Sequence, residues 1–182
     1  EWITLDLISP SMNVPAPDIG TSSREMAWIA DEYRKIHPAD INGAACVTGK
    51  PTSKNGLIGR EEATGRGVQY IVREFFRNPE LLKLCKLDNN LATKTFILQG
   101  LGNVGYHLSK FLTEDDSVKL IGISEFNGGI YNEDGINVEH AKKYFSKHKS
   151  FENYSKATFI KDSSLLLKRQ CDILIPAARE NV

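Results

Sequence analysis

The chain has 182 residues, a formal net charge of zero, and hydrophobic and charged shares of 41% and 25%. This composition is typical of a soluble globular protein of one or two domains and excludes a low-complexity chain. No basic stripe runs along the sequence, which speaks against a nucleic-acid-binding protein. No apolar run approaches the length of a membrane span.

The cysteines and one local basic group add little to this picture. Cys46, Cys85 and Cys171 are far apart, fit no zinc or disulfide spacing, and so suit a reducing compartment. The basic group has the spacing of an amphipathic helix, so we expect a solvated helix face there. Its members are Lys142, Lys143, Lys147, His148 and Lys149.

The N-terminal part predicts one clear helix. Residues 1–12 carry spaced apolar side chains and predict the end of a longer helix, and the prolines of 13–21 predict a rigid loop. Ser22 followed by Glu25 matches a capping box and opens a helix with apolar residues at helical spacing. We expect this helix to end at residues 37–38, His-Pro.

Residues 39–59 are rich in small and polar residues and predict a crossing between two domains. Arg60 then opens a second helix, with acidic residues in its first turn. Gly65 and Gly67 lie inside this helix, where each costs about 1 kcal/mol relative to alanine. Such glycines make sense if another backbone or a flat ligand approaches closely.

The remaining sequence alternates between strand and helix patterns. We expect strands at 95–98, 119–124 and 171–175, and helices at 103–112 and 138–148. This β-α-β order predicts an α/β fold with a Rossmann-like, doubly wound parallel sheet.

A glycine turn lies between the first of these strands and its helix. Gly100 permits a tight turn, Gly102 lets the backbone approach a pyrophosphate, and Gly105 lets helix and strand pack closely. The N-terminus of the helix would present its free N–H groups to the phosphates. Glu125 follows at the distance expected for an acid that binds the ribose. A glycine turn that binds nothing, and an exposed acid at a strand end, remain the alternatives.

Six segments occur in an order that closely resembles the glutamate dehydrogenases of the Glu/Leu/Phe/Val dehydrogenase family. The likeness spans most of residues 13–182. The glycine turn with Asn103 and Val104, followed by Glu125, resembles the NAD-using and dual-cofactor members more than the strictly NADP-dependent ones. The segments are Val14–Asp18, Arg24–Asp31, Val47–Pro51, Ala63–Val68, Gln99–Gly105 and Cys171–Ala178.

The resemblance implies a role for each matching residue. Asp18 would be catalytic and shuttle protons, since a carboxylate in a closed cleft can have a raised pKa. Arg60 would bind the substrate. For Asp18 the alternative is an aspartate that stabilises a turn or caps a helix, and for Arg60 it is an ordinary surface arginine. The cofactor-binding residues would be Thr64, Gly100, Gly102, Asn103, Val104, Gly105, Glu125, Ala177 and Ala178. For Thr64 the alternative is a helix hydroxyl bonded to its own backbone, and for the two alanines it is plain packing.

The resemblance also implies the activity, which is reversible NAD-dependent oxidative deamination of L-glutamate to 2-oxoglutarate and ammonia, with NADP as a possible cofactor. It implies a homohexamer in the cytoplasm or mitochondrial matrix, with no metal, nucleic acid or membrane partner. The family's substrate-activating lysine has no counterpart after Glu1. We therefore expect an internal fragment, inactive alone, with the end of a substrate-binding domain at 1–58 and an incomplete dinucleotide-binding domain at 59–182. A leucine or phenylalanine dehydrogenase and an inactive regulatory paralogue are the alternatives.

Overall fold

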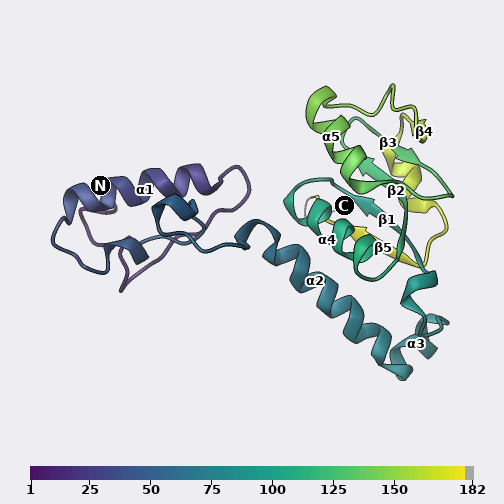
Figure 1. Ribbon diagram of the computed structural model, residues 1–182, viewed down its shortest axis with the longest axis horizontal. Coiled ribbons are helices and arrows are strands. Elements are labelled where there is room, and N and C mark those ends of the chain that lie inside the picture. The colour runs from purple at the N-terminus through teal and green to yellow at the C-terminus, as the bar shows by residue number, and fades with distance from the viewer. Residues whose placement is uncertain (179–182) are drawn as a thin grey trace. The chain divides into compact units, whose positions relative to one another are not determined.

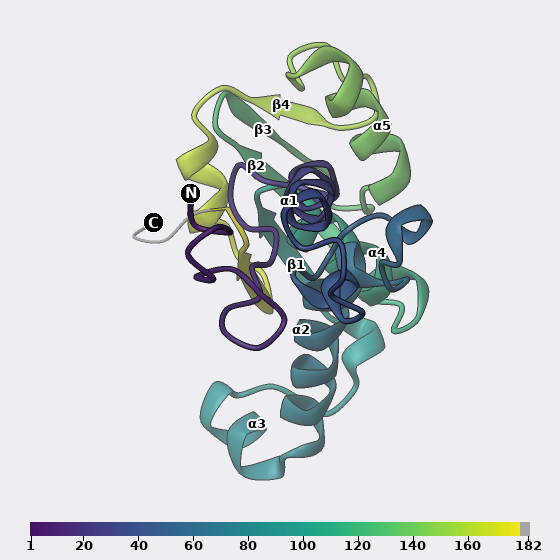
Figure 2. The ribbon, with the colours of Figure 1, turned by 90° about the vertical axis from the view of Figure 1, so that its left-hand side faces the viewer.

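The computed structural model describes residues 1–178 (Figures 1 and 2). The chain divides into two compact units, one of residues Glu1–Glu61 and one that begins at Glu62. Each unit has its own buried apolar cluster.

The first unit is built around α1 (Ser23–Ile36). The predicted capping box is confirmed. The Ser22 side chain accepts a hydrogen bond from the backbone N–H of Glu25, and the Glu25 carboxylate accepts one from the backbone N–H of Ser22. Hydrogen bonds from Ser22 and Arg24 lower the pKa of Glu25 to about 2. One face of α1 packs on the short 3-10 helices and loops that follow. The cluster comprises Met26, Ala30, Tyr33, Cys46 and Val47, near η1 (Gly43–Ala45) and η2 (Thr52–Lys54).

The prediction of a helix over residues 1–12 is wrong. This segment forms turns, in which Asp6 adopts a positive φ of 57° and Ser9 makes an isolated bridge to Asn13. A non-glycine residue at positive φ cannot continue a right-handed helix. The apolar spacing at residues 2–8 therefore did not reflect a helical face.

The second unit contains a five-stranded sheet in the order β4-β3-β2-β1-β5. The central strands β2, β1 and β5 are parallel, as predicted, whereas β3 and β4 extend the sheet in antiparallel fashion and were not expected. The strands are β1 (Thr95–Gln99), β2 (Lys119–Glu125), β3 (Gly128–Tyr131), β4 (Thr158–Ile160) and β5 (Ile173–Pro176).

Side chains of β1 alternate between the two faces of the sheet. Phe96 and Leu98 face the main core, which is covered by helices, while Ile97 lies in a separate cluster with Leu166 of a 3-10 helix on the other face. The helical elements of this unit are α2 (Arg60–Arg77), α3 (Pro79–Cys85), η3 (Leu91–Thr93), α4 (Asn103–Glu114), α5 (Val138–His148) and η4 (Ser163–Lys168). Helices α2, α4 and α5 thus pack in the core on one face of the sheet, and the 3-10 helix η4 covers the other face within the described residues. This arrangement agrees with the predicted α/β fold.

Helix α2 packs closely on α4 at Gly65. A Cβ atom at this position would lie 2.7 Å from the backbone nitrogen of Leu108, so the predicted close backbone approach is confirmed there. At Gly67, no atom of the described residues outside its own helix lies within 4 Å of the corresponding position, so approach by another backbone within residues 1–178 does not explain that glycine.

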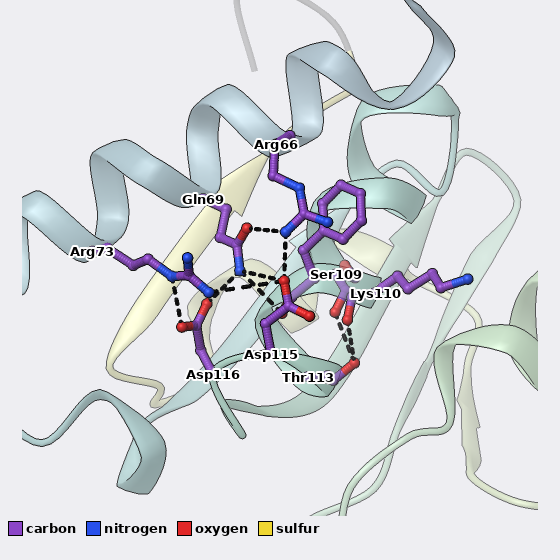
Figure 3. Close-up of polar contacts among 9 residues, drawn as sticks. Arg66, Gln69, Arg73, Ser109, Lys110, Thr113, Asp115 and Asp116 are labelled. Atoms are coloured by element: carbon purple, nitrogen blue, oxygen red, sulfur yellow. Dashed lines mark hydrogen bonds and ion pairs between the residues drawn. The ribbon is translucent and has the colours of Figure 1, made fainter. Parts of the chain in front are cut away.

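A polar network also joins α2 to the end of α4 (Figure 3). Gln69 is fully buried and donates to Asp116 at 2.6 Å. Arg73 donates to the same carboxylate at 2.8 Å, and Arg66 pairs with Asp115. The Arg66 guanidinium, and then Gln69, lower the pKa of Asp115. Because the buried amide of Gln69 and the partly exposed charges around it are all paired, the network holds α2 against the end of α4.

Candidate functional site

A cleft of about 640 Å³ opens at the carboxyl ends of β1, β2 and β5. Strand β2 lies on one side of β1 and β5 on the other (Figure 1). The cleft therefore stands where the chain connections diverge. Ligands of open α/β sheets bind at such a switch point. The lining includes Gly100, Leu101 and Gly102 after β1, Ser124, Glu125 and Phe126 around the end of β2, and Ala177 and Ala178 after β5.

Two glycines of the turn are required by the fold itself. Gly100 has a φ of +86°, and a Cβ atom there would lie 2.8 Å from the Cβ atom of Ala178. A Cβ atom at Gly105 would lie 1.9 Å from the Gly100 carbonyl oxygen. The tight turn and the close packing of helix on strand, which the sequence predicted, therefore both exist here.

Gly102 has no such internal reason to be glycine. Its φ of −75° and ψ of −160° suit other residues, and among residues 1–178 no atom beyond its chain neighbours and its own helix lies within 4 Å of the Cβ position. Gly102 is also the N-cap of α4 and supplies no side-chain cap to that helix. The absent side chain therefore leaves the N–H groups of α4 open to a ligand, which is what a bound pyrophosphate needs.

Glu125 lies beside the turn, with its side chain directed at the backbone. Its Oε1 accepts a hydrogen bond of 2.6 Å from the N–H of Leu101. The carbonyl of Leu101 accepts a bond of 2.7 Å from Nζ of Lys142 on α5. Glu125 from β2 and Lys142 from α5 thus bind the backbone N–H and the backbone carbonyl of Leu101 in the glycine turn.

Lys142 is the exception in the predicted solvated basic face, whose other four members are exposed. The side chain is half-buried, and burial lowers its pKa while the nearby charge of Glu125 raises it in part. Lys149 at the end of α5 also lines the cleft, whereas Lys143 and Lys147 are exposed. Lys142 stands four residues after the buried Val138, so the helical period would have placed it beside the apolar stripe.

Two further lining residues were not predicted. Phe126 follows Glu125 and is 83% exposed at the mouth of the cleft. Gln99 ends β1, and its Oε1 is buried without a hydrogen-bond partner among the described residues. A buried acceptor without a partner is unusual and is readily explained by a ligand or water at this position.

The other predicted cofactor residues occupy different places. Asn103 and Val104 begin α4 beyond the glycine turn. The N–H of Ala177 donates to Gln99 at 2.8 Å, and Ala178 abuts Gly100, so both alanines have packing roles as well as lining the cleft. Thr64 is exposed on the first turns of α2 and is not among the residues that line the cleft.

In the first unit, Asp18 is exposed rather than enclosed in a cleft of that unit. Its Oδ1 accepts a bond of 2.8 Å from the N–H of Ile19, and its backbone exchanges hydrogen bonds with Thr21. Ser22, not Asp18, caps α1. Asp18 is therefore held in a turn with one carboxylate oxygen, Oδ2, free of any hydrogen bond that the described structure makes.

The loop that carries Asp18 is held by two other predicted segments of the same unit. Arg60 donates to the carbonyl of Pro17 at 3.1 Å, and the N–H of Thr48 donates to Pro15 at 2.9 Å. A Cβ atom at Gly49 would lie 2.5 Å from Pro17. Arg60 and the Asp18 loop are thus brought together, which the sequence alone did not indicate.

Among residues 1–178 we find no group of three or more His, Cys, Asp or Glu side chains that could hold a metal ion. Within the same range, no helix combines the length and the apolar character needed to cross a membrane.

Sequence comparison finds two family matches. Residues 56–182 match the glutamate/leucine/phenylalanine/valine dehydrogenase family, and residues 2–35 match the dimerisation domain of the Glu/Leu/Phe/Val dehydrogenases. The mitochondrial glutamate dehydrogenase of Dictyostelium discoideum is 47% identical over 175 residues, which cover 96% of this chain and 35% of that protein. A probable glutamate dehydrogenase of Sinorhizobium fredii is 41% identical over 167 residues, covering 90% of this chain and 37% of the relative.

Solved structures give the same picture. The hetero-hexameric glutamate dehydrogenase of Thermus thermophilus matches with a TM-score of 0.78 and 26% identity, over 98% of this chain and 40% of that one. A glutamate dehydrogenase of Plasmodium falciparum matches with a TM-score of 0.75 and 27% identity, over 97% of this chain and 37% of that one. The chain therefore spans between 35% and 40% of the length of these relatives.

Proposed function

Because the chain belongs to the glutamate/leucine/phenylalanine/valine dehydrogenase family, we propose that it serves the reversible oxidative deamination of L-glutamate to 2-oxoglutarate and ammonia. The observation that carries the proposal is the cleft at the switch point, where Gly102 opens the N-terminus of α4 for no reason internal to the fold. The relatives that match along nearly the whole chain are named as glutamate dehydrogenases.

The family uses a nicotinamide dinucleotide, and the residues of the cleft fit one. A nicotinamide held there would supply the hydride acceptor for the α-carbon of the amino acid. The N–H groups at Asn103 and Val104 would bind the pyrophosphate, and Gly102 gives it room. Glu125 would accept hydrogen bonds from the adenosine ribose, which favours NAD and leaves NADP possible.

The nicotinamide end would involve residues at the other side of the turn. Ala177 and Ala178 would form part of the wall, with Gly100 and Gly105 keeping the turn tight against them. Thr64 would bind the carboxamide. Thr64 lies two residues before Arg66, with which the network of Figure 3 that holds α2 against the end of α4 begins.

Proton transfer is assigned to the first unit. Asp18 would accept and return protons at the substrate nitrogen and oxygen, through the carboxylate oxygen that Ile19 does not bind. Arg60 would bind the substrate while its guanidinium supports the same loop at Pro17. Residues 1–58 would then belong to a substrate-binding domain and 59–182 to the dinucleotide-binding domain.

Self-assembly completes the proposal. Residues 2–35 match a dimerisation domain, and this stretch exposes large apolar side chains, with Trp2 67% and Trp28 59% exposed. Apolar side chains of this size are common at subunit contacts. We expect a homo-oligomer, with a hexamer suggested by the Thermus relative, in the cytoplasm or the mitochondrial matrix.

Glutamate-dependent reduction of NAD, followed by the absorbance of the NADH formed, is the test in the whole protein. Leucine and phenylalanine are the comparison substrates. Turnover with glutamate and little with the others supports the proposal. Binding of NADH without turnover of any amino acid would instead indicate a regulatory dinucleotide-binding protein.

A further inference from the structure

The loop that carries Asp18 has little support of its own. Asp18 is exposed, and among residues 1–178 its hydrogen bonds reach only Ile19 and Thr21, its immediate neighbours in the chain. A group that transfers protons must be held within about 0.5 Å of its productive position by the packing and hydrogen bonds of the residues around it. For Asp18 that support must come from what packs on the two prolines before it.

The segment Val47–Pro51 packs on those prolines. The N–H of Thr48 donates to the carbonyl of Pro15 at 2.9 Å. Gly49 has a φ of +69°, and a Cβ atom there would lie 2.5 Å from Cδ and 2.7 Å from Cγ of Pro17. The ring of Pro17 thus fills the space that a side chain at position 49 would need, so both the backbone and the neighbour require glycine.

A buried lysine that the proposed reaction does not use closes this segment on itself. Lys50 is 8% exposed, and its Nζ donates to the carbonyl of Val47 at 2.8 Å, which bends the chain around Gly49. Lysine is rarely buried without a partner, so this bond gives its burial a structural reason. Val47 itself lies with Cys46 in the buried cluster beside α1. The segment is therefore anchored in the core of the first unit.

We propose that the Val47–Pro51 segment, with Gly49 at its point of contact, is a positioning element that sets where the Asp18 carboxylate lies during proton transfer. The inference rests on the proposed function of Asp18. Gly49 acts through Pro17, the residue before Asp18. The proline ring fixes its own φ and the peptide bond to Asp18 is planar, so a displaced ring displaces the backbone of Asp18.

The size of the effect follows from the contact. In Gly49→Ala the distance to Pro17 must rise from 2.5 Å to at least 3.4 Å, a shift of about 1 Å, and misplacement of this order can cost about 100-fold in rate. We therefore expect kcat for glutamate to fall by about 10- to 100-fold. The same Cβ atom would lie 3.4 Å from Cγ of Arg60, an ordinary contact, so KM for glutamate should change by less than about threefold.

The test measures glutamate-dependent reduction of NAD by the whole protein in two backgrounds, with and without Asp18→Asn. A residue that acts only through Asp18 has nothing left to position once the carboxylate is gone. Adding Gly49→Ala to Asp18→Asn should therefore lower kcat by less than about threefold further.

Gly135→Ala is the matched control for backbone strain. Gly135 also has a positive φ, +109°, but lies in the second unit, where a Cβ atom would meet only the flexible side chain of Lys119 at 3.3 Å. This variant should leave kcat unchanged.

A second pair of variants tests the contact itself and serves if Gly49→Ala alone folds poorly. Pro17→Ala removes the Cγ and Cδ atoms that the new methyl group would strike. Gly49→Ala combined with Pro17→Ala should therefore turn over as fast as Pro17→Ala alone.

Three results would overturn the inference: a normal kcat in Gly49→Ala, a loss that is equally large when Asp18→Asn is present, or a loss that Pro17→Ala does not remove. Failure of the proposed function looks different. A parent protein without glutamate turnover, or an Asp18→Asn variant with near-normal kcat, would refute the role of Asp18, and the positioning element would fall with it.

Discussion

Replacing Gly102 by aspartate should stabilise the fold while it destroys cofactor binding. Gly102 is the N-cap of α4, and the space around its Cβ position is open, so an aspartate side chain fits. Aspartate is a better N-cap than glycine by a few tenths of a kcal/mol, and its charge at the helix N-terminus adds about 0.3–1 kcal/mol. We therefore expect the free energy of unfolding to rise by roughly 0.5–1 kcal/mol.

The same carboxylate would stand where the pyrophosphate is proposed to bind. Two unit charges 4 Å apart repel by about 4 kcal/mol at an effective dielectric of 20, before screening. Gly102 is exposed, so salt and solvent reduce this, and a net loss of about 2 kcal/mol is a fair expectation, or roughly 30-fold in affinity. Occupation of the N–H groups by the new side chain adds to the loss.

Thermal unfolding and NADH titration, measured on the same preparations, are the assays for this prediction. Gly102→Ser is the matched variant, because it caps the helix without a charge and should weaken binding less. Gly67→Ala is the control outside the cleft, since that position is also open. Unchanged NADH affinity in Gly102→Asp would show that no phosphate binds at the N-terminus of α4. A loss of stability would show that the Cβ position is not open.

Four further outcomes are expected. In the whole protein, Asp18→Asn should keep the bond to Ile19 and lower kcat by about 100- to 10,000-fold with little effect on NADH affinity, and a near-normal kcat would leave Asp18 a turn residue. Glu125→Ser should raise kcat/KM for NADP relative to NAD at fixed ionic strength, and an unchanged ratio would place Glu125 away from the ribose. Gly65→Val should lower the thermal midpoint strongly, because its Cβ would meet α4 at 2.7 Å, and an unchanged midpoint would refute that contact. Glu25→Gln should remove the stability that the ionised Glu25 contributes, which is fully present above the ordinary pKa of 4.5 and is lost as the pH falls towards about 2. The free energies of unfolding of the variant and the parent, measured in urea, should therefore become equal near pH 2. A difference that stays constant with pH would contradict the assignment.

Local rules in the sequence predicted the elements whose stability is local. The capping box at Ser22 fixed the start of α1, and the helix predicted at 138–148 begins and ends as expected. The central strands β1 and β2 were predicted because buried parallel strands are short apolar runs between turns. The structural roles of Gly100 in the tight turn and of Gly105 in helix–strand packing were also predicted correctly, because both roles depend on the turn that the two glycines share.

Elements that depend on distant contacts were missed. Strand β3 begins with two glycines and β4 has three residues, so neither carries a pattern of its own, and both exist because they pair with β2 and with each other. Residues 1–12 showed the opposite error, an apolar spacing without a helix.

The sequence predicted some of the residues that line the cleft and missed others. The glycine turn and Glu125 are motif positions, so spacing alone found them. Lys142 and Lys149 were missed because a basic helix face is usually solvated, and only the packing of α5 beside β2 and the glycine turn brings them to the cleft. The contact of Arg60 with Pro17 joins residues 43 positions apart and has no signal in either segment.

The central claim is that a nicotinamide dinucleotide binds at the carboxyl ends of β1, β2 and β5. A crystal structure of the protein with NADH tests it most directly. We predict the pyrophosphate beside Gly102 at the N-terminus of α4, and the adenosine ribose hydroxyls within hydrogen-bond distance of Glu125. A dinucleotide bound elsewhere, or in this cleft with its pyrophosphate away from α4, would contradict the account.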